Sequence, residues 1–384
     1  MADVLMFATN TWPRAARIAS ALVSMEMDVG LIAPAANPAI AADCATVTLR
    51  LAPRTPLAAV ADAIQRSSPR LIIPCDDEAV RRLLKIREAA RVNGSQALAD
   101  CIRCSFGEPD EYPTLMTRAA FLAIAQDAGV RAPATRAVGR LADLASAVAE
   151  VGLPAVLKAD GTYGGLGIAI VRTLDEASAA FRKMEYERPH SLARALARAV
   201  IYRDGVFLRQ RRTTEPAGFS IQAFVSGSPA TSAIACWKGE LLAASHADVL
   251  ASNGGTGPAT VYRCVADAEM DEAARAIVSR FRLSGLHGLD FIRDESNAVH
   301  LLEINPRATT LSNLVVHEGG DLLALLASRA LGRPIQPRPR VPSDEIALFP
   351  QEWQRDSRSQ YLRSAYHDVP WQNPALVRAL LSQV

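Results

Sequence analysis

The chain has 384 residues, of which 49% are hydrophobic, so it is long enough for two or three domains of ordinary size. Its 42 basic and 40 acidic residues are spread along the whole length and leave a formal net charge of +2, without a concentrated basic footprint for nucleic acid or a membrane surface. No apolar run reaches the roughly 18 residues of a membrane-spanning helix, and the first residues lack the basic region of a secretory signal. We therefore expect a cytoplasmic protein with small-molecule partners and no nucleic-acid or membrane partner, and a homo-oligomer stays open.

The first part of the chain alternates short apolar runs with helical patterns. Residues 4–8, 29–33 and 71–74 predict strands, and residues 13–27, 56–67 and 78–92 predict helices. This rhythm is typical of a parallel sheet covered by helices. We therefore predict an N-terminal parallel α/β domain over residues 1–112.

A second unit is predicted over residues 113–332. It opens with a helix that Thr114 or Thr117 caps and that runs to Asp127. From Pro154 onward the pattern is rich in strands, at residues 155–158, 168–171, 219–225, 232–236, 286–292 and 299–304. The chain is thus predicted to join an α/β domain to an α+β domain.

The last segment, residues 333–384, opens with four prolines at positions 334, 337, 339 and 342. Proline removes a backbone donor and fixes φ, so this stretch is predicted to be extended rather than helical or in a central strand. We expect a Pro-rich tail, which either packs on the body as an extension or acts as a lid.

A lysine and a glycine-rich loop form the first motif that carries chemistry. Residues 155–168 read AVLKADGTYGGLGI, which places Lys158 at the end of a buried strand and the loop directly after it. An ammonium supplies a point charge for phosphate, and glycines let backbone N–H groups approach an anion closely. The chain has only four lysines, at positions 85, 158, 183 and 238, so a lysine kept here is informative. Alone the motif does not establish a nucleotide site, because glycine-rich turns are common and strand-end lysines are often solvated.

Two carboxylates on a predicted hairpin form the second motif, within residues 289–307. With the turn at residues 294–297, Asp290 opposes Leu301 and shares one sheet face with Glu303 and Asn305. Asp290 and Glu303 are then diagonal neighbours at roughly 7 Å. Because both strands are otherwise apolar, these carboxylates need a compensating charge, and magnesium prefers such oxygen ligands. The alternative interpretation is an amphipathic hairpin whose polar face lies in water.

The ordered set of motifs resembles the ATP-grasp superfamily, which includes biotin carboxylase, D-alanine:D-alanine ligase and the carbamoyl phosphate synthetases. The resemblance covers about residues 113 to 330 and implies a two-lobed ATP-grasp domain after the N-terminal domain. It implies an ADP-forming ligase that uses ATP and Mg²⁺, with Mn²⁺ as an alternative ion, to join a small-molecule carboxylate to an amine. Two other functions stay open, an ATP-binding regulatory or scaffold protein with little turnover and an ATP-grasp phosphotransferase. A dinucleotide-dependent oxidoreductase is disfavoured, because the first strand is not followed by a GxGxxG pattern.

The same resemblance implies roles for single residues. Lys158 would contact the α- and β-phosphates, and Arg118 stands where the family often has a lysine. The loop glycines Gly161, Gly164, Gly165 and Gly167 would close over the triphosphate. Asp290, Glu303 and Asn305 would hold the metal ion. Arg307 would act with Lys158 in catalysis, facing the γ-phosphate or the acyl intermediate.

The adenine hinge departs from the commoner family pattern. Gln222 occupies the position where many members have a glutamate, and its amide oxygen would accept from the adenine amino group. Backbone groups of Ala223 and Val225 would read the edge of the base. No acidic ribose contact follows the hinge, since Pro229 lies in that region. The alternative for Gln222 is a polar residue at the rim of a strand.

Overall fold

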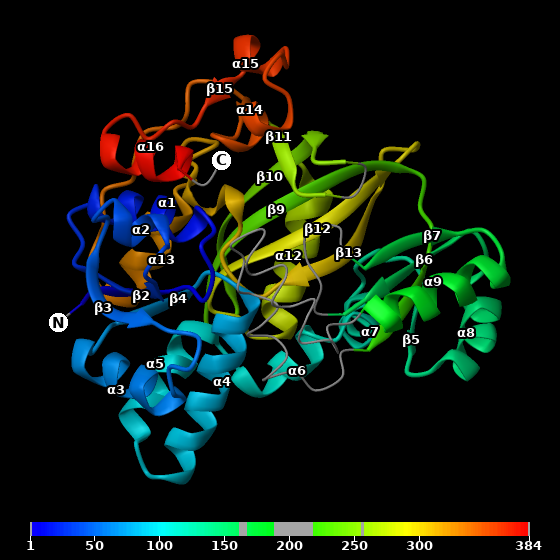
Figure 1. The fold of residues 1–384 in the computed structure, drawn as a ribbon, viewed down its shortest axis with the longest axis horizontal. Coiled ribbons are helices and arrows are strands. Elements are labelled where there is room, and N and C mark those ends of the chain that lie inside the picture. The colour runs from blue at the N-terminus through cyan, green and yellow to red at the C-terminus, as the bar shows by residue number, and fades with distance from the viewer. Residues whose placement is uncertain (1, 161–166, 188–217, 255–256, 383–384) are drawn as a thin grey trace.

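The computed structural model describes residues 2–160, 167–187, 218–254 and 257–382. Three sheets organise these residues: a parallel sheet near the N-terminus, a long antiparallel sheet in the centre and a small antiparallel sheet beyond it (Figure 1). The predicted combination of a parallel α/β domain with two antiparallel lobes is therefore confirmed.

The N-terminal sheet has the strand order β3-β2-β1-β4 and is parallel throughout. Its strands are β1 (Val4–Phe7), β2 (Val29–Pro34), β3 (Thr46–Leu51) and β4 (Leu71–Pro74), and all residues of β1, β2 and β4 are buried. The helices are α1 (Arg14–Val23), α2 (Pro38–Ala41), α3 (Leu57–Ser67), α4 (Asp77–Val92) and α5 (Gln96–Phe106). The sequence predicted the buried strands because they read as continuous apolar runs, whereas the partly exposed edge strand β3 was missed.

A short helical connection leads from the N-terminal domain to the small sheet. It contains η1 (Pro109–Glu111), α6 (Tyr112–Leu115) and α7 (Arg118–Asp127), and Thr117 lies at the N-cap position of α7. The small sheet has the order β5-β8-β6-β7, with β5 (Thr135–Val138), β6 (Ala155–Ala159), β7 (Ile168–Val171) and β8 (Phe219–Ala223). The helices η2 (Leu141–Asp143), α8 (Leu144–Val151) and α9 (Leu174–Glu187) pack against it.

The large sheet has the order β13-β12-β9-β10-β11-β14-β15. Its main strands are β9 (Gly227–Trp237), β10 (Glu240–Ser252), β11 (Ala259–Val265), β12 (Gly285–Asp294) and β13 (Val299–Asn305). Both faces of β9 are buried: Ala233 and Ala235 lie in the core that includes α13 (Leu322–Leu331), and Ile234 and Cys236 lie in the core that includes α12 (Ala268–Arg280). A strand covered on both sides does not alternate in hydrophobicity, so the sequence predicted only residues 232–236 of β9 and neither β10 nor β11.

The C-terminal segment packs on two parts of the molecule. Its proline-rich start has no helix or strand, as predicted, and Arg338 in it forms an ion pair of 2.8 Å with the fully buried Asp321. Further on, β14 (Glu345–Ala347) pairs with β11 and β15 (Tyr366–His367) pairs with β14. The remaining helices are η3 (Thr310–Asn313), α14 (Gln351–Arg355), α15 (Tyr361–Ser364) and α16 (Pro374–Leu381). This segment therefore adds two strands to the large sheet. The domain boundary at residue 332 stays a prediction.

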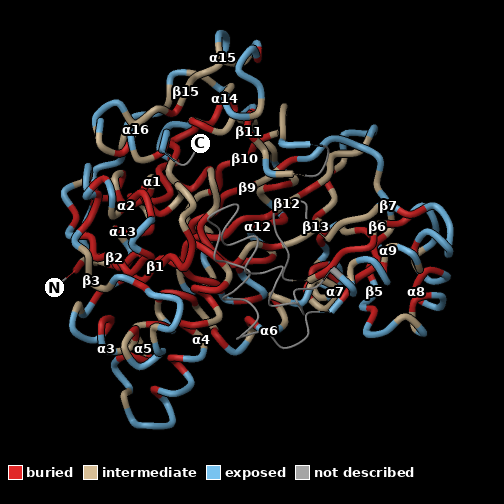
Figure 2. Tube along the Cα trace, viewed as in Figure 1, coloured by how far each residue is buried: buried red, intermediate tan, exposed pale blue. Residues whose placement is uncertain are grey.

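Buried residues run continuously from the N-terminal sheet into the large sheet (Figure 2). One hydrophobic cluster joins β1 and β2 to η3 and α13, and a second joins the other face of the same sheet to α12. The N-terminal domain is therefore packed against the large sheet rather than tethered to it. No helix in the described ranges is long and apolar enough to cross a membrane.

Candidate functional site

The hairpin of β12 and β13 places the two predicted metal-binding carboxylates directly opposite each other. The sequence predicts Asp290 opposite Leu301, but Asp290 pairs with Glu303, while Phe291 pairs with Leu301. The predicted register is therefore wrong for two reasons. The strands pair one residue further along from the turn, with Arg293 opposite Val299, and Leu302 is then the extra residue of a β-bulge that the spacing does not reveal. Directly opposed residues have nearer Cβ atoms than diagonal ones, so the side chains of Asp290 and Glu303 start closer together than in the predicted register.

Among the described residues, the hydrogen-bond donors to Asp290 are both neutral. Its Oδ1 accepts from the hydroxyl of Thr231 at 2.8 Å, and its Oδ2 accepts from Nδ2 of Asn305 at 2.9 Å. Burial, followed by repulsion from the carboxylate of Glu303, raises the pKa of Asp290. Negative charge at this position is therefore costly until a cation arrives.

Glu303 is held by a cation from another element. Arg118, the first residue of α7, donates from Nη2 to Glu303 Oε2 at 2.7 Å, and its Nη1 donates to Asp160 Oδ1 at 2.8 Å and to Ser220 Oγ at 3.3 Å. Burial alone would raise the pKa of Glu303, but Arg118 and then Lys158 lower it. Arg118 thus joins the large sheet to the small sheet at the site, and Glu303 keeps its charge.

Lys158 is the last residue but one of β6 and lies near this pair. Only 7% of it is exposed, and its ammonium makes no hydrogen bond or ion pair among the residues that the structure describes. Burial lowers the pKa of Lys158 to about 8, although Glu303 opposes the shift. A buried ammonium without a hydrogen-bond acceptor is unfavourable unless a ligand supplies one.

Arg307 lies at the junction with the N-terminal domain. Its Nε donates to Asp77 Oδ1 at 3.0 Å, and its Nη2 donates to Asn305 Oδ1 at 2.9 Å. Burial, and then repulsion from the neighbouring Arg307, lowers the pKa of Arg14 in α1 to about 10. The Nε of Arg14 is buried and has no hydrogen-bond partner among the described residues. The predicted catalytic arginine is therefore firmly positioned, and a second guanidinium stands beside it.

The predicted adenine hinge forms the strand β8 and its end. Gln222 is 1% exposed, and its Nε2 donates to Thr135 Oγ1 at 3.1 Å, so it is a buried residue rather than one at a strand rim. The N–H of Ala223 donates to the carbonyl of Ala134 at 2.8 Å, so this group is already engaged within the sheet. Val225 follows the strand and is half-buried. The roles of these three residues toward adenine stay predictions.

The glycine-rich loop falls mainly outside the described residues. Gly161, Gly164 and Gly165 belong to residues 161–166, which the structure does not describe. Gly167 is described, with φ of +69°, and its carbonyl accepts from the N–H of Ala159 at 2.8 Å. Gly167 therefore pairs with Ala159, the residue after Lys158, at the point where β6 and β7 meet the loop.

Asp290 and Glu303 fit a divalent cation. Repulsion between the two carboxylates shifts the pKa of Asp290 upward, and an ion between them would relieve it. Glu303 Oε1 has no hydrogen bond in the described part of the chain, so it is free to ligate. Both ends of the Asn305 amide are engaged, by Asp290 and by Arg307, which suits an orienting role as well as the predicted ligand role. No cluster of three or more His, Cys, Asp or Glu suited to a metal occurs in the described ranges.

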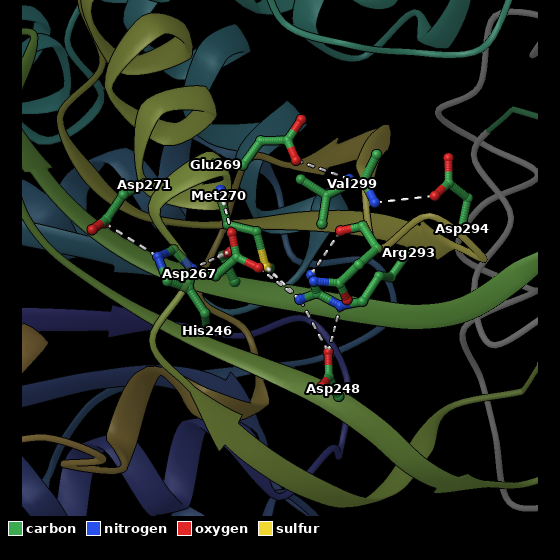
Figure 3. Close-up of polar contacts among 12 residues, drawn as sticks. His246, Asp248, Asp267, Glu269, Met270, Asp271, Arg293, Asp294 and Val299 are labelled. Carbon is green, nitrogen blue, oxygen red and sulfur yellow. Dashed lines mark hydrogen bonds and ion pairs between the residues drawn. The ribbon is translucent and has the colours of Figure 1, made fainter.

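The opposite face of the large sheet is fixed by a second polar network (Figure 3). Arg293 of β12 lies 2.8 Å from Asp267 Oδ2 and 3.3 Å from Asp248 Oδ1. Glu269 of α12 accepts from the N–H of Val299 at 3.2 Å. These contacts hold both strands of the hairpin against α12. They stabilise the backbone that carries Asp290 and Glu303 from the opposite face of the sheet.

A row of Ser232, His246 and Asp271 lies in the same region. Ser232 Oγ is 2.7 Å from His246 Nδ1, and His246 Nε2 is 3.2 Å from Asp271 Oδ1. The residue types match a nucleophile, base and orienting acid. Ser232 is fully buried, however, so no substrate reaches its hydroxyl, and the row serves to join β9 and β10 to α12.

Sequence reasoning missed several residues that complete the site: Asp77, Asp160, Ser220, Thr231 and Arg14. A signal existed for Asp77, because Asp76 and Asp77 directly follow β4 at the carboxyl edge of a parallel sheet, where ligands often bind. Asp76 caps α4, since its Oδ1 accepts from the N–H of Ala79 at 2.9 Å. Asp77 additionally pairs with Arg307.

The electrostatic coupling of the two carboxylates can be measured directly. Replacing Glu303 by Gln removes a negative neighbour, so the pKa of Asp290 should fall toward its ordinary value while burial keeps it elevated. Carbon-13 NMR titration of labelled aspartate carboxyls measures this, with Glu295→Gln in the exposed turn as a matched control. An unchanged Asp290 pKa in Glu303→Gln would show that the two groups do not share one site.

Comparisons with known proteins agree with this architecture. Residues 204–311 match the family model of the ATP-grasp domain, and no curated protein matches the chain by sequence. Biotin carboxylase from Campylobacter jejuni superposes with a TM-score of 0.61 at 15% identity, over 88% of this chain and 72% of that one. N5-carboxyaminoimidazole synthetase from Staphylococcus aureus has a TM-score of 0.61 at 11% identity, over 88% and 79%. The biotin carboxylase domain of Hydrogenobacter thermophilus 2-oxoglutarate carboxylase has a TM-score of 0.59 at 14% identity, over 88% and 71%. The predicted resemblance is thereby confirmed, and the chain has the ATP-grasp fold.

Proposed function

We propose that the protein is an ADP-forming ligase, which uses ATP to phosphorylate a small-molecule carboxylate and then joins it to an amine. The observation that carries this proposal is the buried ammonium of Lys158, which has no acceptor among the described residues and lies beside Glu303 and Asp290. A polyphosphate would supply the missing acceptor oxygens. The carboxylates would hold the Mg²⁺ that accompanies it.

Solved proteins of the same fold support the nucleotide and the ion. The Hydrogenobacter thermophilus domain is a dimer in complex with MgADP, ADP and bicarbonate, and the Staphylococcus aureus enzyme is in complex with ADP. By analogy we propose ATP with Mg²⁺ for this chain, and we keep a homo-oligomer as part of the proposal.

The arrangement of charge suits phosphoryl transfer. Lys158, Arg118 and Arg307 bring three cations close to the carboxylate pair. Preorganised charges of this kind stabilise the negative charge that develops at the transferring phosphoryl group. Bound magnesium would neutralise further charge on the phosphate oxygens.

Activation by phosphate explains why a carboxylate reacts at all. An amine cannot displace oxide from a carboxylate at a useful rate. In the proposed reaction a carboxylate oxygen attacks the γ-phosphorus, the bond from that phosphorus to ADP breaks, and an acyl phosphate forms. The amine then attacks the acyl carbon, phosphate leaves, and the amine loses a proton. Arg307, buried and anchored to Asp77 and Asn305, is positioned to orient the acid next to the phosphates.

Nucleotide affinity should depend on the charge of Lys158. The pKa of Lys158 is about 8 in the ligand-free protein, and a bound phosphate would raise it. The charged form binds, so affinity should be constant well below pH 8. It should fall by up to about 10-fold per pH unit above that value until the pKa of the complex is reached.

Lys158→Met tests this dependence. The variant should bind MgATP about 30-fold or more weakly and should lose the decline above pH 8, because no titrating cation remains. Lys183→Met, which removes an exposed lysine of α9, is the matched control and should behave as the unmodified protein. Isothermal titration calorimetry from pH 6.5 to 9.5 provides both readouts, and unchanged affinity in Lys158→Met would remove the basis of the proposal.

Turnover is tested with a panel of amino acids and other small carboxylates, each offered with ammonia and with primary amines. A productive pair should release ADP and phosphate in the presence of Mg²⁺. Glu303→Gln should reduce that rate by at least about 100-fold and stay folded, because the substitution removes charge at constant shape. Glu295→Gln should leave it unchanged. Release of AMP and pyrophosphate, phosphate transfer to a stable product, or full activity of Glu303→Gln would each contradict the ligase.

A further inference from the structure

A cationic pocket lies in the N-terminal domain and shares no lining residue with the candidate active site. Its volume is about 260 Å³, and it lies between the loop that follows β3 and one face of α4. The loop contributes Arg54 and Thr55, and the helix contributes Glu78, Arg81, Arg82 and Lys85. These helix positions are spaced by three and four residues, so their side chains emerge on the same side of α4. Both α3 and α4 lie on the lower side of the N-terminal sheet in Figure 1.

The pocket carries an excess of positive charge. Its four cations face a single carboxylate, which leaves a net charge of +3. Glu78 forms ion pairs with two of the cations. Its Oε1 is 3.0 Å from Arg82 Nε, and its Oε2 is 3.6 Å from Arg81 Nη1. Arg54 and Lys85 have no ion-pair partner in the described part of the chain, and both are exposed. Like charges from two separate elements face one cavity, so an anion that enters it would be attracted from both sides.

The loop side of the pocket is preorganised. Pro53 and Pro56 flank Arg54 and Thr55 and restrict the backbone on both sides. Thr55 Oγ1 accepts from the N–H of Ala52 at 2.8 Å, which orients the hydroxyl and leaves its proton available as a donor. A ligand here would therefore meet a neutral donor and a guanidinium from one side and cations of α4 from the other.

We propose that this pocket binds the phosphate group of a small phosphorylated molecule. A phosphate monoester carries about −1.5 to −2 charge and three acceptor oxygens, which matches the net charge and the donors from two directions. A lone carboxylate has one charge and two oxygens, so it would leave more of the pocket's charge uncompensated. The volume is slightly below the roughly 300 to 1,000 Å³ typical of whole-ligand sites, which suits a phosphate with a few attached atoms rather than a nucleoside triphosphate.

The pocket lies close to the candidate active site along α4. Asp77, the partner of Arg307, is the first residue of that helix, and Arg81 and Lys85 follow it by four and eight residues. A helix rises 1.5 Å per residue, so these positions lie roughly 6 and 12 Å further along its axis. The proposal does not rest on ligase activity, because phosphate binding is measured without turnover.

Inorganic phosphate and glycerol 3-phosphate are the probes, titrated into the full chain by calorimetry at constant ionic strength and with saturating MgADP to occupy a nucleotide site. We expect saturable binding that weakens about 10-fold or more in Arg54→Gln/Lys85→Gln. The matched control Arg70→Gln/Lys183→Gln removes one exposed arginine and one exposed lysine elsewhere, and it should change affinity by less than about 2-fold. Circular dichroism and the melting temperature establish that each variant is folded.

The two probes also distinguish the source of the phosphate. Tighter binding of glycerol 3-phosphate identifies an organic phosphate, and equal binding identifies the phosphate group alone as the ligand, and either result supports the proposal. The proposal is overturned if neither probe saturates below about 10 mM, a Kd that corresponds to weak binding. Equal affinity in the pocket variant and the control, or equally tight binding of succinate, would also overturn it. If the full chain binds phosphate but does not bind MgADP, the result would contradict the proposed ligase function and leave the phosphate pocket supported.

Discussion

The guanidinium of Arg118 is the contact on which the site depends. It reaches from α7 to Glu303 in the large sheet and to Asp160 and Ser220 in the small lobe, so a single side chain joins three elements. Without it, two carboxylates would face each other and a third would lie near them. The planar guanidinium of an arginine can donate to two carboxylates in a fixed geometry. The ammonium of a lysine, on a flexible stem, holds such a cluster less well. This explains why arginine at this position suits the chain.

Arg118 also determines what is left for a ligand. Because it satisfies Glu303 and Asp160, Lys158 is left as a buried ammonium without an acceptor, and Asp290 is left with neutral donors. The site thus has two parts. One is the ammonium of Lys158, which has no hydrogen-bond acceptor among the described residues, and the other is the pair of Asp290 and Glu303, whose negative charges repel each other. A magnesium-bound polyphosphate is complementary to both parts, since it offers oxygens to the ammonium and a divalent ion to the carboxylates. The site is preorganised, because its charged groups are held before any ligand arrives. Arg118 of α7 holds Glu303, and the ion pair of Arg293 with Asp267, which precedes α12, holds the hairpin.

How much of this the sequence predicted depends on how local each feature is. The strands around Lys158 and the hairpin around Asp290 were predicted because their apolar runs are continuous, and the same-face placement of Asp290 and Glu303 followed from period two. The pairing was predicted incorrectly, because the register is shifted by one residue from the turn and by another at the β-bulge of Leu302, and local spacing reveals neither shift. The partners Asp77 and Asp160 were missed because they lie 230 residues from Arg307 and 42 from Arg118. Such contacts are set by how the domains pack. The roles of the loop glycines and the hinge residues stay predictions.

If ATP activates a carboxylate by transferring its γ-phosphoryl group to it, the fate of one oxygen atom reveals that transfer. The acid that the panel identifies is labelled with oxygen-18 in its carboxylate, incubated with MgATP and the amine, and the released phosphate is analysed by mass spectrometry. A carboxylate oxygen becomes the bridge of the acyl phosphate, so one labelled oxygen should appear in each phosphate formed with product. Unlabelled phosphate accompanying amide formation would contradict the acyl phosphate and with it the proposed use of Lys158, Asp290 and Glu303.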